Sequence, residues 1–380
     1  MTGKQKVLIF IDWYKPAYKA GGPIQSMSKM IEFQKDYFEF YIFCGNKDLG
    51  ENEPLLNVAS DQWNRLENEN VYYSSKGLNT NLFNQLIHNI QPDTIYINGI
   101  FSINFSIKPI FFSSFLKIKI VVASRGMLGE GAILFKKYKK ELFLFVAKTL
   151  LFGNKKIVWH ATDENEFIQI KRRIGSKSNV IKLSNFFPEL STKNKKHKEG
   201  FSIIFFSRIS EKKNLMFAIE CLSKLVTPVY LKIVGPIDDK KYFENCKLFL
   251  DKSTTIKYDF VGPILPINIE KQFEDVNYFI LPTFHENFGH VIVESLSFKT
   301  PVIISQNTPF KTLEKYGFGY DLPLDKKDHW IEVLTQLSLE TNKTYQGRIK
   351  LLEKNYSEFL NNTHLIKKYQ QLLHNEQSKT

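Results

Sequence analysis

Two carboxylates eight positions apart stand out in the stretch FHENFGHVIVESLSFKTPVIIS, residues 284–305. Glu286 is followed by a predicted loop through Asn287 and Gly289, and Glu294 lies in an apolar helical pattern. A helix that starts near Gly289 would direct its first backbone amides at an anion such as a phosphate. Glu294, on the first turns of that helix, offers two acceptor oxygens and no donor, which suits the vicinal hydroxyls of a ribose.

Two further loops carry groups that suit a phosphorylated ligand. In FFSRISEKKN, Arg208 and Lys213 flank a loop after a predicted strand, where two cations could bracket a diphosphate. Gly21 and Gly22 follow the first predicted strand and would let backbone amides approach a ligand closely. A solvated charged turn and a plain glycine turn have the same composition, so the spacing alone leaves both alternatives open.

A metal site is the competing interpretation of the same segment. Glu286, His290 and Glu294 are spaced by four residues and would share one face if the whole segment were helical. The loop residues Asn287 and Gly289 argue against a continuous helix, and no further ligand-spaced Cys, His or Asp lies nearby. The sequence therefore predicts no metal, while a surface-helix role for Glu294 remains an alternative.

The chain as a whole predicts a folded protein of two domains. Its 380 residues exceed what one hydrophobic core usually supports, and 43% of them are hydrophobic and 24% charged. The cysteines, Cys44, Cys221 and Cys246, lie far apart without metal-ligand spacing, which indicates reduced core thiols. No apolar run is long enough for a signal-peptide core or a bilayer span, so we expect a cytoplasmic protein.

Short apolar runs alternate with helical patterns along both halves of the chain. The first half opens with KVLIFID, a glycine loop and a helix from about Ile24, and the second opens with FSIIFFSR, a loop and the helical LMFAIECLSKL. This alternation predicts the α/β class, with two Rossmann-like, doubly wound domains facing one another across a cleft. We expect domains over residues 1–190 and 200–360, joined by the lysine-rich linker STKNKKHKEG, with a C-terminal helix at about 360–380 packing on the first.

The net charge of +13 is concentrated in one region. Residues 131–200 contain sixteen Lys or Arg against six Asp or Glu. Within it, the stretch 132–152 mixes lysines with Phe and Leu as a basic amphipathic helix does, and such a helix can lie on an anionic membrane. Burial of its apolar side chains in a core, with solvated lysines, is an equally good interpretation.

Several of these segments, in this order, resemble a known family. LPTFHENFGHVIVESLSFKTPVIIS contains the pattern E-x7-E from Glu286 to Glu294, and FFSRISEKKN matches a stretch that supplies an Arg and a Lys. SRGMLGEGAILFKKYKK is similar to a first-domain loop, WHATDENE to an element near the end of that domain, and KLSNFF to a P-N-G element. The chain resembles family 4 of the retaining glycosyltransferases, which have the GT-B fold, over most of its length.

The resemblance implies transfer of a sugar from a nucleotide diphosphate sugar, with retention of configuration and with neither a bound metal nor another cofactor. Members are thought to use a front-face route in which the leaving phosphate takes the acceptor proton, so no covalent nucleophile is expected. The residues that the resemblance assigns to catalysis are Arg208, Lys213 and Glu286. The residues that it assigns to the donor are Gly21, Gly22, Asn287, Phe288, Gly289 and Glu294.

The sequence departs from the family pattern in the first domain. Many relatives have His-Gly where this chain has Arg125-Gly126, and the P-N-G element is reduced to Ser184-Asn185-Phe186. Arg125 would add positive charge near the cleft. Arg125 and His160 are candidate acceptor or cleft residues, and for His160 a hydrogen-bonded core histidine is the alternative.

The charge and the resemblance together predict the kind of acceptor and leave two alternative functions open. The basic, aromatic stretch 132–152 favours a lipid-linked or membrane-presented glycan acceptor, as in synthesis of lipopolysaccharide, capsule or other surface polysaccharides at the inner face of the cytoplasmic membrane. A protein that binds nucleic acid or an anionic surface is one alternative, but no nucleic-acid module accompanies the charge, so we predict no nucleic acid. A GT-B epimerase or glycogen-type synthase is the alternative among enzymes.

Overall fold

The computed structural model of the protein describes residues 3–129, 133, 137–152, 156–197, 199–360 and 362–375. The chain divides into two compact units, each with its own sheet of mainly parallel strands. Unit 1 comprises Met1–Phe186 and Asn362–Thr380, and unit 2 comprises Phe187–Asn361. The predicted α/β class is confirmed.

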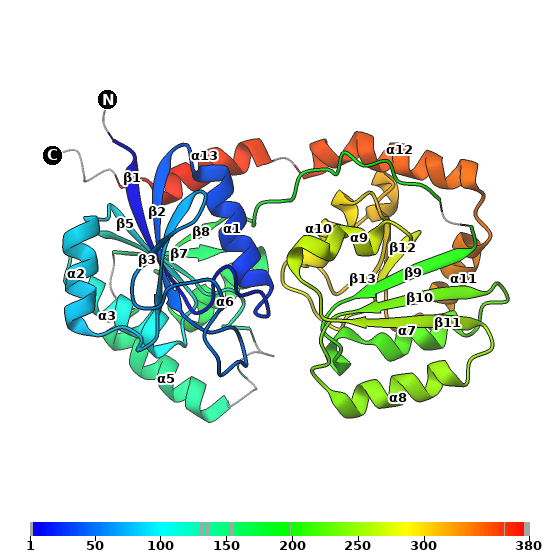
Figure 1. The fold of residues 1–380 in the computed structure, drawn as a ribbon, viewed down its shortest axis with the longest axis horizontal. Helices are drawn as coiled ribbons and strands as arrows, with labels where there is room; N and C mark the ends of the chain where they lie inside the picture. The colour runs from blue at the N-terminus through cyan, green and yellow to red at the C-terminus, as the bar shows by residue number, and fades with distance from the viewer. Residues whose placement is uncertain are drawn as a thin grey trace. The chain divides into compact units, whose positions relative to one another are not determined.

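Unit 1 contains an eight-stranded sheet of order β3-β4-β2-β1-β5-β6-β7-β8 (Figure 1). Every neighbouring pair is parallel except β3 and β4, which are antiparallel. The central strands are buried on both faces, which is why they are almost continuous apolar runs. The strands are β1 (Gln5–Ile11), β2 (Phe38–Gly45), β3 (Trp63–Arg65), β4 (Glu69–Ser74), β5 (Thr94–Asn98), β6 (Lys119–Ala123), β7 (Ile157–Ala161) and β8 (Asn179–Lys182).

Helices cover both faces of the unit 1 sheet. One hydrophobic core joins the sheet to α1 and α13, and a second core joins its other face to α2, α3, α5 and α6. Helix α13 comes from the end of the chain and packs beside α1 (Figure 1). The helices are α1 (Gly22–Gln34), α2 (Thr80–Ile90), α3 (Lys108–Ser113), α5 (Lys137–Leu150), α6 (Glu164–Arg173) and α13 (Asn362–Leu373), and a π-helical turn spans Ile103–Ile107.

Unit 2 contains a six-stranded, wholly parallel sheet of order β11-β10-β9-β12-β13-β14. From β9 the chain builds the sheet outward in one direction to β11, and from β12 it builds outward in the other direction to β14. This order is that of a doubly wound nucleotide-binding sheet. The strands are β9 (Phe201–Phe206), β10 (Val229–Val234), β11 (Ile256–Gly262), β12 (Tyr278–Leu281), β13 (Val302–Ser305) and β14 (Gly319–Leu322).

Helices α7, α8 and α11 cover one face of the unit 2 sheet, and α9, α10 and α12 cover the other (Figure 1). One continuous core of buried side chains fills this unit. The helices are α7 (Leu215–Leu222), α8 (Lys240–Asp251), α9 (Ile269–Phe273), α10 (His290–Ser297), α11 (Lys327–Ser338) and α12 (Asn342–Phe359). Short 3-10 turns span Glu211–Lys213, Pro266–Asn268 and Leu313–Tyr316.

The predicted elements that open the two halves are present. KVLIFID contains β1 and FSIIFFSR contains β9, while α1 begins at Gly22, two residues before the predicted start. The helix predicted over 132–152 is α5, and most of its predicted first turn lies outside the described residues.

The lysine-rich stretch that the sequence predicts as a linker is anchored to unit 2. Its residues form neither helix nor strand where they are described. Ser191 Oγ donates to Glu270 Oε1 (2.6 Å), and the buried Lys195 ammonium donates to the Phe273 carbonyl. These polar partners belong to α9 and lie 79 and 78 positions away in the sequence, so the composition of the stretch alone could not reveal them.

The structure also bears on the predictions of reduced core cysteines and of no membrane-spanning segment. Cys44, Cys221 and Cys246 are buried and free, as expected for core thiols. In the described part of the chain, no helix combines the length and the apolar character that crossing a membrane requires.

Candidate functional site

The predicted catalytic residues of unit 2 lie where the strand order of its sheet reverses. Strands β9 and β12 are neighbours, with Ile203 paired to Tyr278 and Ile204 to Phe279. Because the strands are parallel, the loops after both of them leave the same edge of the sheet. The first loop carries Arg208 and Lys213, and the second carries Glu286.

Backbone contacts and one ion pair hold these two loops together. The Phe284 N–H donates to the Lys212 carbonyl (2.9 Å), and Thr283 Oγ1 donates to the same oxygen (3.1 Å). The Lys213 ammonium forms an ion pair with Glu286 Oε2. The structure thus brings together two side chains, 73 positions apart, that the sequence analysis placed in one site.

The Lys213–Glu286 pair lies in a largely desolvated position. Lys213 is 9% exposed and Glu286 is half-buried. A cation withdrawn from water needs an anionic or strongly polar partner, because its hydration is lost. Glu286 meets that need here, so an incoming anion that took over Lys213 would release the Glu286 carboxylate for a different partner.

Helix α10 begins directly after this pair. Gly289 has a φ of 75° at its N-cap, and a Cβ there would lie 2.8 Å from Ile292 Cδ1 and 3.2 Å from Glu286 Cγ. Glycine is therefore required both for the backbone conformation and for the close approach of Glu286. The N-terminal end of α10 carries a partial positive charge, which adds to that of Lys213.

The other predicted donor residues surround the start of α10. The Asn287 N–H contacts Glu286 Oε1 (3.3 Å). The Phe288 ring stacks on Phe187 (5.7 Å between centroids), so its side chain contributes to packing. Glu294 is half-buried, one turn into the helix from its start.

Arg208 and an unpredicted lysine add positive charge at the same edge. Arg208 is exposed, and its Nη1 lies 3.2 Å from Asp238 Oδ2. The pKa of Lys212 is lowered by partial burial and by the cations Lys213 and Arg208, with Glu286 opposing them. Nothing in the run EKKN distinguishes Lys212 from its neighbours, so the sequence alone does not predict its place in the site.

In unit 1, Gly21 and Gly22 form the start of α1. Gly21 is the N-cap, with a φ of 63°, and its carbonyl accepts from the Ile24 N–H (3.1 Å). The loop that leads to it is held by Asp48, which accepts from the Tyr18 N–H (3.0 Å). The sequence offered no signal for Asp48, because this contact joins segments 30 residues apart.

A buried carboxylate also anchors the beginning of that loop. Tyr14 Oη donates to Glu69 Oε1 (2.9 Å), and the Lys15 ammonium lies 3.0 Å from the same oxygen. At the end of β1, burial raises the pKa of Asp12, and a hydrogen bond with Ser102 partly opposes the shift. These acidic groups were not predicted to belong to the site.

Arg125 follows β6 and lies in a network of polar side chains. It has a φ of 50°, which is unusual for a residue with a side chain. Its Nε donates to Asn98 Oδ1 (2.6 Å), its Nη1 to Asn185 Oδ1 (2.8 Å) and its Nη2 to Tyr96 Oη (3.0 Å). These three hydrogen-bond partners are all neutral, and Arg125 lies at the carboxyl end of β6.

Glu166, in the WHATDENE segment, fixes the turn that presents Arg125. Its carboxylate accepts from Ser124 Oγ (2.6 Å), the Gly126 N–H (2.7 Å) and both the N–H and Oγ1 of Thr162 (2.7 Å each). Burial alone would raise the Glu166 pKa, but these hydrogen bonds outweigh it and the pKa is lowered. Glu166 is therefore a positioning residue that the sequence analysis did not single out.

His160, predicted as an acceptor or cleft residue, lies in the core of unit 1 instead. His160 is completely buried, with Nδ1 2.7 Å from Tyr96 Oη and Nε2 2.9 Å from the Leu183 carbonyl. Burial and the nearby Arg125 lower its pKa to about 4. It is a hydrogen-bonded core histidine, the alternative that the sequence had left open, and it supports Tyr96 in the Arg125 network.

Glu286, His290 and Glu294 were the alternative interpretation of this segment, as ligands of a metal ion. Among the residues that the structure describes, no group of three or more His, Cys, Asp or Glu side chains is arranged to hold a metal ion. Glu286 pairs with Lys213 instead and precedes the helix that carries the other two.

Known proteins resemble the chain both in sequence and in structure. Residues 186–350 match the family model described as Glycosyl transferases group 1. Similar solved structures include sucrose-phosphate synthase from Thermosynechococcus elongatus, with 14% identity and a TM-score of 0.72 over 97% of this chain and 98% of that one. HepE from Anabaena in complex with UDP and glucose has 14% identity and a TM-score of 0.66 over 97% and 99%.

A third similar structure is WaaG, a glycosyltransferase involved in lipopolysaccharide biosynthesis, with 11% identity and a TM-score of 0.64 over 97% and 99% of the two chains. No curated protein matches the sequence. At these identities the solved structures establish the fold, which is GT-B. Residues 186–350, which include both charged loops and α10, are similar to the group 1 glycosyltransferases.

The buried His160 makes a prediction about the pH dependence of stability. Its pKa is about 4 in the folded protein, against an ordinary value of 6.5. The unfolded chain therefore binds a proton that the folded chain does not bind, and stability should fall as the pH decreases from about 7 towards 4, by up to ~1.4 kcal/mol per pH unit from this group.

Urea unfolding at a series of pH values would measure this slope. We expect the His160→Gln variant to lose about one proton equivalent of pH dependence between pH 7 and 4, and His88→Gln, on an exposed part of α2, to control for removal of one imidazole. An unchanged slope in His160→Gln would show that this residue does not titrate as its burial implies.

Proposed function

We propose that the chain transfers a sugar from a nucleotide diphosphate sugar to an acceptor, with retention of configuration and without a bound metal. The observation that carries the proposal is the Lys213–Glu286 pair at the start of α10, within the segment that matches the glycosyltransferase family. Lys213 and the N-terminus of α10 can both bind a phosphate group. Glu286 can leave Lys213 when a phosphate replaces it, so the three groups together suit a diphosphate sugar.

The proposed mechanism depends on stabilising the leaving group. Breaking the bond between sugar and diphosphate builds negative charge on the phosphate oxygens, so cations aimed there stabilise the transition state more than the ground state. Lys213 would exchange Glu286 for a phosphate oxygen, and the exposed Arg208 would bind the diphosphate with its guanidinium. The leaving phosphate would take the acceptor proton, so no covalent nucleophile is required.

Donor recognition is assigned to the residues around α10. Once Lys213 binds phosphate, Glu286 is free to accept hydrogen bonds from hydroxyls of the transferred sugar, beside the amides of Asn287, Phe288 and Gly289. Glu294 would accept from the ribose hydroxyls. The donor role of Gly21 and Gly22 in unit 1 remains a prediction. HepE structures contain UDP-glucose, so UDP sugars are the first donors to test.

The acceptor is proposed to be a glycan or lipid-linked molecule at a membrane surface. Helix α5 buries Leu144 and Ala147 but exposes Tyr138, Leu142 and Phe145, which are 89%, 67% and 77% exposed. Apolar side chains exposed together on a helix mark an interaction surface, and nearby Lys139 and Lys148 favour an anionic one.

Two further observations bear on the choice of acceptor. The likeness to WaaG supports surface-polysaccharide synthesis, with the protein at the cytoplasmic face of the membrane. Sucrose-phosphate synthase, whose TM-score of 0.72 exceeds the 0.64 of WaaG, favours a synthase with a soluble acceptor as the second candidate. The exposed face of α5 is the feature that favours the membrane.

Removing either proposed phosphate-binding cation should lower turnover. With a donor that the protein hydrolyses or transfers, Lys213→Ala and Arg208→Ala should each decrease kcat by about 100-fold, because each loses charge that acts on the leaving group. Steady-state kinetics over a range of donor concentrations would separate this effect from a change in KM. Lys224→Ala, an exposed lysine of unit 2, serves as the control. Full turnover in both variants would contradict the assignment of Arg208 and Lys213 to the leaving group.

The proposed membrane surface can be tested separately from the chemistry. The purified protein should co-float with vesicles containing phosphatidylglycerol at low salt and detach as salt is raised, because charge attraction is screened. Leu142→Glu/Phe145→Glu should abolish flotation, whereas Leu248→Glu/Phe249→Glu, the same change on exposed positions of α8, should not. Flotation that persists in the α5 variant would show that this helix is not the membrane contact.

A further inference from the structure

A separate pocket lies in unit 1, at the end of the sheet opposite to Arg125. It has a volume of about 690 Å³ and is lined by residues 117–119, Lys156 and the last turn of α13 with the two residues after it. Lys119 is the first residue of β6 and Lys156 directly precedes β7, so the pocket lies at the amino ends of these strands. Arg125 follows the carboxyl end of β6, so the pocket is distinct from the Arg125 network.

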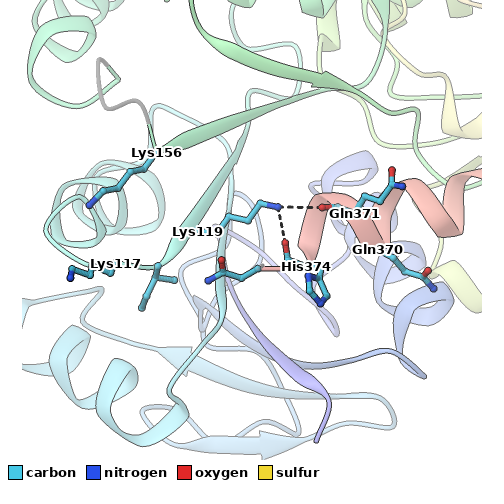
Figure 2. A pocket seen from close by; sticks show the side chains of 8 residues that line it. Lys117, Lys119, Lys156, Gln370, Gln371 and His374 are labelled. Atoms are coloured by element: carbon cyan, nitrogen blue, oxygen red, sulfur yellow. Dashed lines mark hydrogen bonds between the residues drawn. The ribbon is translucent and has the colours of Figure 1, made fainter. Parts of the chain in front are cut away.

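The lining of this pocket is strongly basic. It includes Lys117, Lys119, Lys156 and His374, and none of its eight residues is an Asp or a Glu. Figure 2 shows Lys117 and Lys156 on one side of the pocket and His374 on the other, with Lys119 between them. Like charges gathered around one concave site repel one another, and an anion bound among them would relieve that repulsion.

The three lysines of the pocket differ in their hydrogen bonds and in their exposure. Lys119 Nζ donates to the carbonyls of Gln371 (3.2 Å) and His374 (2.9 Å), so it stabilises the C-terminal end of α13, where a cation is favoured (Figure 2). Lys156 Nζ contacts the Leu116 carbonyl (3.2 Å) but its residue remains exposed, as does Lys117. Lys119 is therefore part of the wall, while the other two present charge at the opening.

The size of the pocket suits a phosphorylated molecule rather than a simple halide. Gln370 and Gln371 complete the lining on the α13 side of the pocket (Figure 2). The volume falls within the range of small-molecule sites and exceeds that of one phosphate, so it leaves room for an attached organic group.

We propose that this pocket binds the phosphate group of a phosphorylated small molecule or lipid. The ligand would connect β6 and β7 to the end of α13, the helix that the chain contributes to unit 1 after completing unit 2. Occupancy should therefore stabilise the docking of α13 against the sheet. The site requires neither the donor residues of unit 2 nor transfer activity.

The test uses the full chain, with glycerol 3-phosphate as the soluble probe. The imidazole resonances of His374, assigned with His374→Gln, report on this pocket and not on Lys213. In the wild type, we expect the chemical shifts of the His374 imidazole to change saturably with glycerol 3-phosphate. In Lys117→Gln/Lys156→Gln, we expect the affinity for glycerol 3-phosphate to be at least about tenfold weaker, which corresponds to ~1.4 kcal/mol. Lys35→Gln/Lys76→Gln, with the same loss of charge on exposed positions of unit 1, should bind as the wild type does.

A lipid source is distinguished by a second titration, with vesicles that contain phosphatidic acid or only phosphatidylcholine. Shifts of His374 with glycerol 3-phosphate identify a soluble ligand class, and shifts with phosphatidic acid alone identify a lipid headgroup. In either case the probe should raise the Tm of the wild type more than that of Lys117→Gln/Lys156→Gln, because it binds only the folded state. No response of His374 to either probe, or an equal response in the two lysine variants, would overturn the proposal.

Discussion

The desolvated charge of Lys213 is the constraint on which the candidate site depends. A lysine that is 9% exposed must be paired, and its partner Glu286 lies on the loop after a different strand. The pairing fixes the loops after β9 and β12 relative to each other and brings Glu286 close enough to α10 that only glycine fits at position 289. Local backbone conformation and electrostatics thus reinforce one another at the reversal point of the sheet.

Unit 1 also holds a cation in a fixed position, but with different partners. The Arg125 guanidinium is held by the neutral oxygens of Asn98, Asn185 and Tyr96, while the turn that carries it is fixed by the Glu166 carboxylate. In unit 2 the charge is paired with the Glu286 carboxylate. In unit 1 the three hydrogen-bond partners of the guanidinium are neutral.

The strands and the charged motifs could be predicted from sequence because their signals are local. Buried parallel strands such as KVLIFID are continuous apolar runs, and Glu286 and Glu294 occupy positions set by one loop and one helix. The positioning groups could not be predicted in this way. Glu166 and His160 acquire their roles from partners that are distant in sequence, Ser124 after β6 and Leu183 after β8, and a buried histidine and a surface histidine look the same in a sequence.

Calorimetric titration with UDP, GDP, ADP, CMP and dTDP, each with and without EDTA, tests the central claim most directly. We predict that one nucleoside diphosphate binds saturably, that binding persists in EDTA, and that Glu294→Ala weakens it about tenfold through the lost ribose contacts. Absence of binding by all five nucleotides to a folded sample, or binding that EDTA abolishes, would contradict a metal-independent nucleotide-sugar site at the start of α10.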